Sequence, residues 1–288
     1  MAGTPTMASC EASIYFLDSE HDIYKAEKPY VCLVPLTHAP PEFDQTNIKM
    51  VPHDVVVKNV RGSETEFKLD VQGFQLVKHN PQFSDWYNGP SVVNEYYPYV
   101  VDVLKDQLKA GKVYIYDHSA SLLSISHRIL VRIMALSFNL TNSSCVWAIT
   151  SKPIRQDFKD EAEDLLSKRF QIVKYLKVFH PPRSNPVLQQ PIAFCDYRTS
   201  SHDGFPADLV YPHLANENML FRHSPGQQWY FVDQQRIKEA WMFKIADSSE
   251  EPNVSKFCPH TSFVIPSRDN KDTPLRRSIE FRAYVFYD

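Results

Sequence analysis

The sequence has 288 residues, of which 43% are hydrophobic and 23% are charged, a composition typical of a folded globular protein. Its 31 basic and 34 acidic residues give a net charge of −3, and no basic stripe indicates a nucleic-acid partner. No apolar run reaches the roughly 18 residues of a membrane-spanning helix, and the N-terminus lacks the segments of a signal peptide. We therefore predict a cytoplasmic protein without nucleic-acid or membrane partners.

The five cysteines are odd in number and widely spaced, and none forms a Cys-x-x-Cys pair. This pattern argues against a disulfide framework and against a zinc knuckle. No internal repeat, low-complexity stretch or linker divides the chain. We therefore predict that residues 1–288 form a single domain with a loose N-terminal tail of about twelve residues.

The first half of the chain combines strands with one long helix. Strands are predicted at Glu11–Leu17, at Val51–Val60 and, after a turn at Arg61–Ser63, at the alternating stretch Phe67–Val71. Apolar residues then recur at three- and four-residue spacing, which predicts a helix over Asn94–Ala110 with Gly111 as its C-terminal cap.

The second half is mostly β. A strand at Lys112–Asp117 precedes an amphipathic helix at Phe158–Lys168, whose acidic start suits the helix dipole. One turn of helix is predicted at Ile237–Ala240. The remaining predicted strands are Phe170–Phe179, Pro191–Asp196, Met219–His223, Trp229–Val232, Ala240–Ala246 and Ile279–Tyr287. This order predicts a mainly β sandwich or barrel with flanking helices, and composition does not distinguish a jelly roll from other barrels.

Several short blocks resemble, in their order and spacing, a group of fungal non-heme iron, 2-oxoglutarate-dependent oxygenases that includes CmcJ, AsaB and NvfI. The resemblance extends from about residue 61 to the C-terminus. The blocks are Val60-Arg61-Gly62, Phe67-Lys68-Leu69-Asp70, Tyr96-Tyr97-Pro98, Val113–His118, Asp160–Leu166, Phe194–Arg198, Gln228-Trp229-Tyr230, Pro259–Phe263 and Ser278–Ala283.

This resemblance implies a double-stranded β-helix, or jelly-roll barrel. In such oxygenases Fe(II) is held by a His-x-Asp pair and a distal histidine, which leave positions open for cosubstrate and oxygen. An arginine on a late strand pairs with a carboxylate of 2-oxoglutarate. The resemblance places His260 at the distal histidine and Arg282 at this arginine.

The sequence departs from the family at the other two iron ligands. Asn142 and Ser144 occupy the positions of the His-x-Asp pair, and no histidine lies between His127 and His180. An amide oxygen and an un-ionised hydroxyl are weak donors to Fe(II). A second departure is Lys174–Val178, where relatives tend to carry Asn-x-Trp-Arg-Pro. We therefore expect His260 to be a remnant ligand, Arg282 to be a vestigial 2-oxoglutarate residue, and this chain to hold neither cofactor.

Three hypotheses for function follow from the resemblance. The first is a catalytically deficient subunit that pairs with an active paralogous oxygenase, which carries Fe(II) and 2-oxoglutarate, in fungal meroterpenoid biosynthesis; a homodimer is the alternative assembly. The second is a non-redox isomerase or cyclase acting on a terpenoid, with His260, Asp117 and His118 as candidate acids or bases. The third is an active oxygenase with atypical ligands such as Asn142 or Asp157.

Each candidate residue also has a purely structural interpretation. His260 could be a core histidine, and Arg282 a strand charge paired with Glu280. Cys145 could be a nucleophile, but no His/Asp scaffold supports that role, and an inert core cysteine is favoured. Arg276 and the adjacent Arg277 are interpreted as loop charges.

Overall fold

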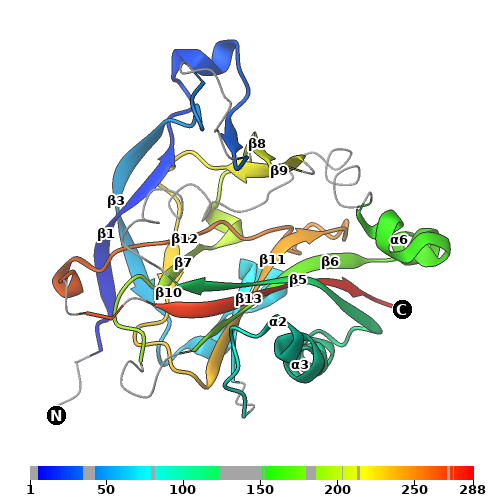
Figure 1. The fold of residues 1–288 in the computed structure, drawn as a ribbon. Helices are drawn as coiled ribbons and strands as arrows, with labels where there is room; N and C mark the ends of the chain where they lie inside the picture. The colour runs from blue at the N-terminus through cyan, green and yellow to red at the C-terminus, as the bar shows by residue number, and fades with distance from the viewer. Residues whose placement is uncertain are drawn as a thin grey trace.

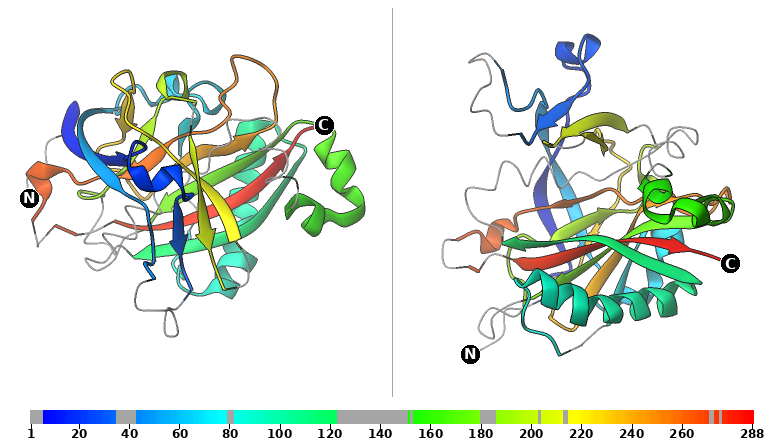
Figure 2. Two further views of the ribbon diagram at one scale, coloured as in Figure 1. Left: turned by 90° about the horizontal axis from the view of Figure 1, so that it is seen from above. Right: turned by 45° about the vertical axis from the view of Figure 1, so that its right-hand side comes forward.

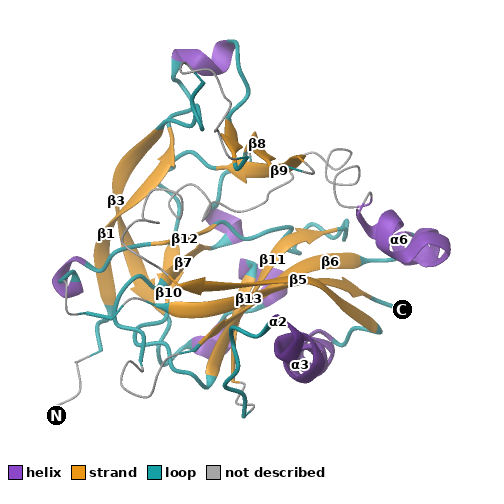
Figure 3. Ribbon diagram, viewed as in Figure 1, coloured by secondary structure: helices purple, strands orange, loops and turns teal. Residues whose placement is uncertain are grey.

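The computed structural model describes residues 6–34, 43–78, 82–122, 151, 153–179, 186–202, 204–212, 215–270, 273–274 and 276–288. Two five-stranded β-sheets face each other, and a three-stranded sheet extends from one end (Figure 1). The first sheet has the strand order β1-β3-β10-β7-β12, the second β4-β11-β6-β13-β5 and the third β2-β8-β9. This is a mainly β architecture with flanking helices, as the sequence predicts (Figure 3).

The strands are β1 (Ser9–Leu17), β2 (Tyr30–Cys32), β3 (Met50–Asn59), β4 (Phe74–Lys78), β5 (Lys112–Leu122), β6 (Phe170–Val178), β7 (Ile192–Cys195), β8 (Phe205–Val210), β9 (Ala215–Leu220), β10 (Trp229–Phe231), β11 (Glu239–Asp247), β12 (His260–Ser262) and β13 (Arg277–Phe286). The α-helices are α1 (Leu69–Gln72), α2 (Gly89–Ser91), α3 (Tyr97–Leu108) and α6 (Ala162–Leu166). A π-helical turn covers Val92–Tyr96, and short 3-10 turns cover Asp22–Lys25, Glu64–Glu66, Lys159–Glu161, Tyr197–Thr199 and Pro266–Arg268.

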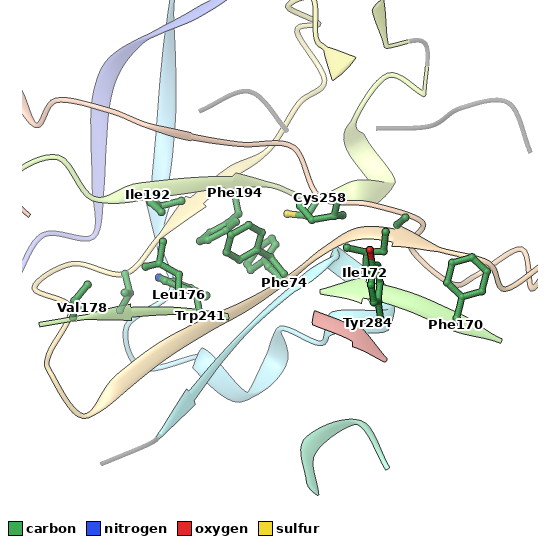
Figure 4. Packing of buried hydrophobic residues seen from close by; sticks show 14 of the residues in the cluster. Phe74, Phe170, Ile172, Leu176, Val178, Ile192, Phe194, Trp241, Cys258 and Tyr284 are labelled. Atoms are coloured by element: carbon green, nitrogen blue, oxygen red, sulfur yellow. The ribbon is translucent and has the colours of Figure 1, made fainter. Parts of the chain in front are cut away.

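The central strand of the second sheet, β6, is buried along its whole length and has apolar side chains on both of its faces. Ile172 and Leu176 point toward the first sheet, whereas Val173 and Tyr175 pack with residues of α3. Figure 2 shows α3 lying along this sheet. Between the two sheets, Phe194 of β7 meets Leu176 and Trp241 (Figure 4). Side chains that point to the inner face of the second sheet therefore lie inside the barrel.

Several sequence predictions are confirmed and others are wrong. The strand at Ala240–Ala246 forms, and Val51–Val60 and Phe170–Phe179 each form all but the last residue. Phe67–Val71 is not a strand: it enters the short helix α1, which ends at the left-handed Gly73 (φ 92°). Ile237–Ala240 is a turn followed by β11 and not a helix.

The helix expected to end at Gly111 ends earlier. Lys109 (φ 55°) supplies the left-handed cap, and a side chain at Gly111 would collide with Asp288. The described residues include no helix long and apolar enough to cross a membrane. The cytoplasmic location and the single domain stay predictions.

In two of the sequence blocks shared with the oxygenase family, the charged residue has a structural role. Arg61 donates two hydrogen bonds to the carboxylate of Glu239, at 2.6 and 3.0 Å, and another to the carbonyl of Asp233 at 2.9 Å. This contact ties the end of β3 to β11. A bidentate guanidinium–carboxylate pair fixes orientation as well as distance. Arg61 therefore has a structural role.

Asp70, in a second block, belongs to a partly buried charge network, in which its own side chain is half-exposed. Arg169 binds Asp247 at 2.7 Å and Asp70 at 2.8 Å, and Lys244 binds Asp70 at 2.6 Å. The side chains of Lys244 and Asp247 are completely buried. The network holds α1 against β6 and β11, so Asp70 too is explained by the fold.

Candidate functional site

A line of charged side chains crosses the inner face of the second sheet. Lys174 lies on β6, Glu280 and Arg282 on β13, and Asp117 on β5. The strand register pairs Lys174 with Arg282 and pairs Arg282 with Asp117. Lys174 alternates with the interior residues Ile172 and Leu176, so its side chain also enters the barrel. We call these four charged residues the interior tetrad.

The interior tetrad is joined by three ion pairs. Lys174 Nζ lies 3.1 Å from Glu280 Oε1, and Arg282 Nη2 lies 2.9 Å from the same oxygen. The other terminal nitrogen of Arg282, Nη1, contacts Asp117 Oδ2. Side-chain exposure rises along the line, from 9% at Lys174 to 18%, 25% and finally 52% at Asp117. The tetrad thus runs from the core to the protein surface.

His260 enters the same interior from the opposite sheet. It begins β12, is buried, and its Nδ1 lies 2.9 Å from the carbonyl oxygen of Cys258. Since a carbonyl only accepts, Nδ1 carries the proton. The imidazole stands edge-on to Phe243 with 4.5 Å between ring centroids, and Lys174 Nζ lies 5.9 Å from the centroid of the same phenyl ring. The Lys174 cation and the His260 imidazole therefore share one aromatic neighbour.

The electrostatics follow from burial and these close charges. Burial and the positive charge of Lys174 lower the pKa of His260 to about 3, so the imidazole is neutral. Burial alone would raise the pKa of Glu280, but the charges of Lys174 and Arg282 outweigh it and bring that pKa to about 2. Glu280 is therefore a carboxylate. Burial lowers the pKa of Lys174 and the charge of Glu280 opposes this, and we assign Lys174 as an ammonium because it lies 3.1 Å from that carboxylate. The interior tetrad then carries two positive and two negative charges.

Arg282 faces the interior, but its charge is already neutralised. Both terminal nitrogens of the guanidinium are engaged by carboxylates, those of Glu280 and Asp117. Pairing with Glu280 was the alternative interpretation of Arg282, and the structure contains that pair. A dicarboxylate such as 2-oxoglutarate would have to displace it. Arg282 is therefore poorly suited to hold a cosubstrate.

The sequence predicts that Arg276 and Arg277 are loop charges. Arg277 instead begins β13, whereas Arg276 precedes that strand and lies outside it. The side chain of Arg276 is buried, with Nε 2.9 Å from the carbonyl of Gln190 and Nη1 2.6 Å from Ser278 Oγ. Among the described residues no carboxylate forms an ion pair with it. Burial accordingly lowers the pKa of Arg276 to about 10. A buried guanidinium that lacks a carboxylate partner suits a ligand carboxylate better than Arg282 does. Sequence alone did not reveal this, because only the fold buries the residue.

The candidate acids and bases, Asp117, His118 and His260, do not all lie on one face of the sheet. Asp117 points along the interior tetrad, but His118 lies on the opposite face of β5, where its Nδ1 is 2.8 Å from the hydroxyl of Tyr97. His118 also packs on Phe281, which belongs to the core beneath α3. Asp157 is exposed. Of the three candidate acids or bases, only Asp117 and His260 face the inner side of the barrel.

The residues that the structure describes do not fit an iron centre. They contain no group of three His, Cys, Asp or Glu side chains able to hold a metal. Glu280, the carboxylate whose charge acts on His260, is bound by Lys174 and Arg282. Asn142, Ser144 and Cys145 lie outside the described residues, so their assignment to the lost ligand positions and their neighbourhood stays a prediction.

Comparison with known proteins identifies the family of this chain. Residues 14–286 match the YDMC family, described as an oxidoreductase/YMDC permease-like domain. The hydroxylase/desaturase asaB of Aspergillus flavus is 28% identical over 250 residues, covering 81% of this chain and 80% of that protein. The Fe(II)/2-oxoglutarate-dependent dioxygenase nvfI of Aspergillus novofumigatus is 25% identical over 309 residues, covering 99% of both.

The fold agrees with these matches. A solved structure of the iron and alpha-ketoglutarate-dependent endoperoxidase NvfI has a TM-score of 0.81, covers 98% of this chain and 99% of that one, and shares 23% of its sequence. The jelly-roll fold implied by the resemblance is thereby confirmed. The chain therefore belongs to the oxidoreductase/YMDC permease-like domain family, and its relatives are fungal Fe(II)/2-oxoglutarate-dependent oxygenases of natural-product biosynthesis.

Proposed function

We propose that this chain is a catalytically deficient subunit that pairs with an active paralogous Fe(II)/2-oxoglutarate oxygenase in fungal meroterpenoid biosynthesis. In this proposal the chain holds neither cofactor, and its partner carries both. By binding the folded partner it would raise the partner's apparent stability and complete its substrate pocket.

The observation that carries the proposal is the environment of His260. A catalytic iron needs several strong donors around open coordination positions. Here the imidazole neighbours the ammonium of Lys174, and the carboxylate of Glu280 is already bound by two cations. In this proposal the chain keeps the barrel of an oxygenase. In the described part of its interior, Lys174 and Arg282 take up the carboxylate that lies near His260.

The cofactors are tested first on the chain alone. Anaerobic titration with Fe(II) and 2-oxoglutarate, followed by calorimetry and by the metal-to-ligand charge-transfer absorbance, is expected to give no saturable signal. The paralogous oxygenase, titrated in the same buffer, is the positive control. A charge-transfer band from this chain alone would overturn the proposal.

Pairing is tested by co-expression with a paralogous oxygenase encoded beside it. We expect a complex that survives size-exclusion chromatography, and an oxidation rate for the mixture above the rate of the paralogue alone. Turnover of a pathway intermediate by this chain without iron, 2-oxoglutarate and oxygen would establish the isomerase or cyclase instead. A monomer or homodimer with no effect on the paralogue's rate would refute the subunit role.

A further inference from the structure

The interior tetrad balances its own charges without a metal. In the interior tetrad, Lys174 and Arg282 supply two positive charges, and Glu280 and Asp117 supply two negative ones. A divalent ion placed here would add two further positive charges to a poorly solvated interior, which is strongly unfavourable. The buried guanidinium of Arg276 already supplies another positive charge that acts on Glu280. The carboxylates of the described interior are therefore neutralised without a metal.

The position of Lys174 gives this balance a specific meaning. The ammonium lies 3.1 Å from Glu280 Oε1 and 5.9 Å from the centroid of Phe243, the ring that packs edge-on against His260. It thus stands among a carboxylate, an aromatic face and an imidazole. Carboxylates and imidazoles are the donors that first-row divalent metals prefer.

We propose that the Lys174 ammonium is a built-in substitute for a metal cation, which neutralises Glu280 and excludes divalent ions from the neighbourhood of His260. This inference rests on the proposed function, because an active oxygenase would need that neighbourhood for its metal. The inference goes beyond that function, because it attributes the exclusion of divalent ions to the charge of Lys174 and not merely to the loss of metal ligands. Metal affinity should therefore return in part when this side chain is removed.

The test is metal rescue of Lys174→Ala in the full chain, with Co²⁺ alone as the probe. Removing the ammonium opens space beside Glu280 and His260 and leaves the interior tetrad one positive charge short. We expect Co²⁺ to give a saturable visible absorption band in this variant and to raise its Tm by about 2–4 °C at ten times the dissociation constant. The wild-type protein is expected to show neither effect, and a chelator should leave its Tm unchanged.

Two further variants locate the effect. Lys177→Ala is the matched control: Lys177 is a buried lysine on the same strand, but it points to the opposite face and donates to the carbonyl of Ile237. It should gain no response to Co²⁺. Lys174→Ala combined with Glu280→Gln should lose the response, because the carboxylate is then absent.

The outcomes separate this inference from the proposed function. A folded Lys174→Ala protein without a Co²⁺ response, or a wild type that responds equally, overturns the inference. Should Lys174→Ala not fold, refolding it with Co²⁺ is expected to recover folded protein and refolding with Na⁺ is not; equal recovery overturns the inference too. Turnover by the wild type with Fe(II) and 2-oxoglutarate overturns the proposed function, whichever result the variants give.

Discussion

Glu280 links both cations of the interior tetrad, so replacing it with glutamine tests the electrostatic reasoning directly. Lys174 lies 3.1 Å and Arg282 2.9 Å from the same carboxylate oxygen, and only 18% of the Glu280 side chain is exposed. Glu280→Gln preserves the shape of the side chain and removes its charge. Two partly buried cations would then face each other, with only Asp117 to offset them.

The magnitude follows from the shifted pKa. The carboxyl group is brought from its ordinary pKa of 4.5 to about 2, although burial opposes this shift. At about 1.4 kcal/mol per pKa unit, that difference corresponds to about 3 kcal/mol of stability at neutral pH. Removing one partner of a buried ion pair costs a similar amount, about 3–5 kcal/mol.

The pH dependence has a definite sign. Because the folded-state pKa of Glu280 lies below its unfolded value, the contribution is fully present above pH 4.5 and is lost as the pH falls toward 2. In the wild type, acid protonates the carboxylate and removes the same charge that the variant lacks. The stability difference between the two proteins should therefore shrink across this range.

Urea denaturation of both proteins at pH 7, pH 4 and pH 3 measures this difference. Glu163→Gln is the matched control, because Glu163 is exposed and pairs only with Arg155; it should leave the unfolding midpoint unchanged. A Glu280→Gln protein with wild-type stability at pH 7 would refute the reasoning. So would a deficit that stays constant as the pH falls.

Three more changes test the remaining assignments by the free energy of unfolding. Arg276→Met should cost less than about 1 kcal/mol or stabilise the protein, since it removes a buried charge without a carboxylate partner. Arg282→Met should cost about 3 kcal/mol, because it leaves two carboxylates without their cation. The reverse order of the two costs would contradict these environments. Asp247→Asn should cost about 3–5 kcal/mol at pH 7, because it leaves Lys244 and Arg169 without their buried partner. This loss should diminish in acid, below the ordinary carboxyl pKa. The control Asp164→Asn removes an exposed carboxylate and should show no such loss. Arg61→Lys keeps the charge but not the two-pronged contact with Glu239, so it should cost about 1–2 kcal/mol, and a cost near zero would show that charge alone suffices.

Local patterns predicted much of the fold because they act over a few residues. The apolar stretches at Val51–Val60, Phe170–Phe179 and Ala240–Ala246 correspond to β3, β6 and β11. The alternation at Phe67–Val71 gave a wrong prediction, because there the chain turns into α1. Contacts from distant residues decide that turn: Ser255 donates to the carbonyls of Leu69 and Asp70, and Lys244 to that of Gly73.

The candidate site was predictable only in part. Motif order indicated the family, and with it the positions of His260 and Arg282, because such blocks are local sequence. Their surroundings depend on residues far apart in the chain. From the sequence, Lys174 belongs only to a divergent segment and Arg276 is predicted to be a loop charge, with nothing to indicate that it is buried.

What the sequence by itself determined is the run of strands, the family resemblance and the histidine-free stretch at the expected ligand positions. Each depends on residue identity and short spacing. What only the tertiary structure decided is which charges meet. Strand register sets Lys174 beside Arg282 and Arg282 beside Asp117, and the facing sheet brings His260 to the same interior. Electrostatic energy depends on distance and burial, and both are fixed only when the two sheets close around these side chains.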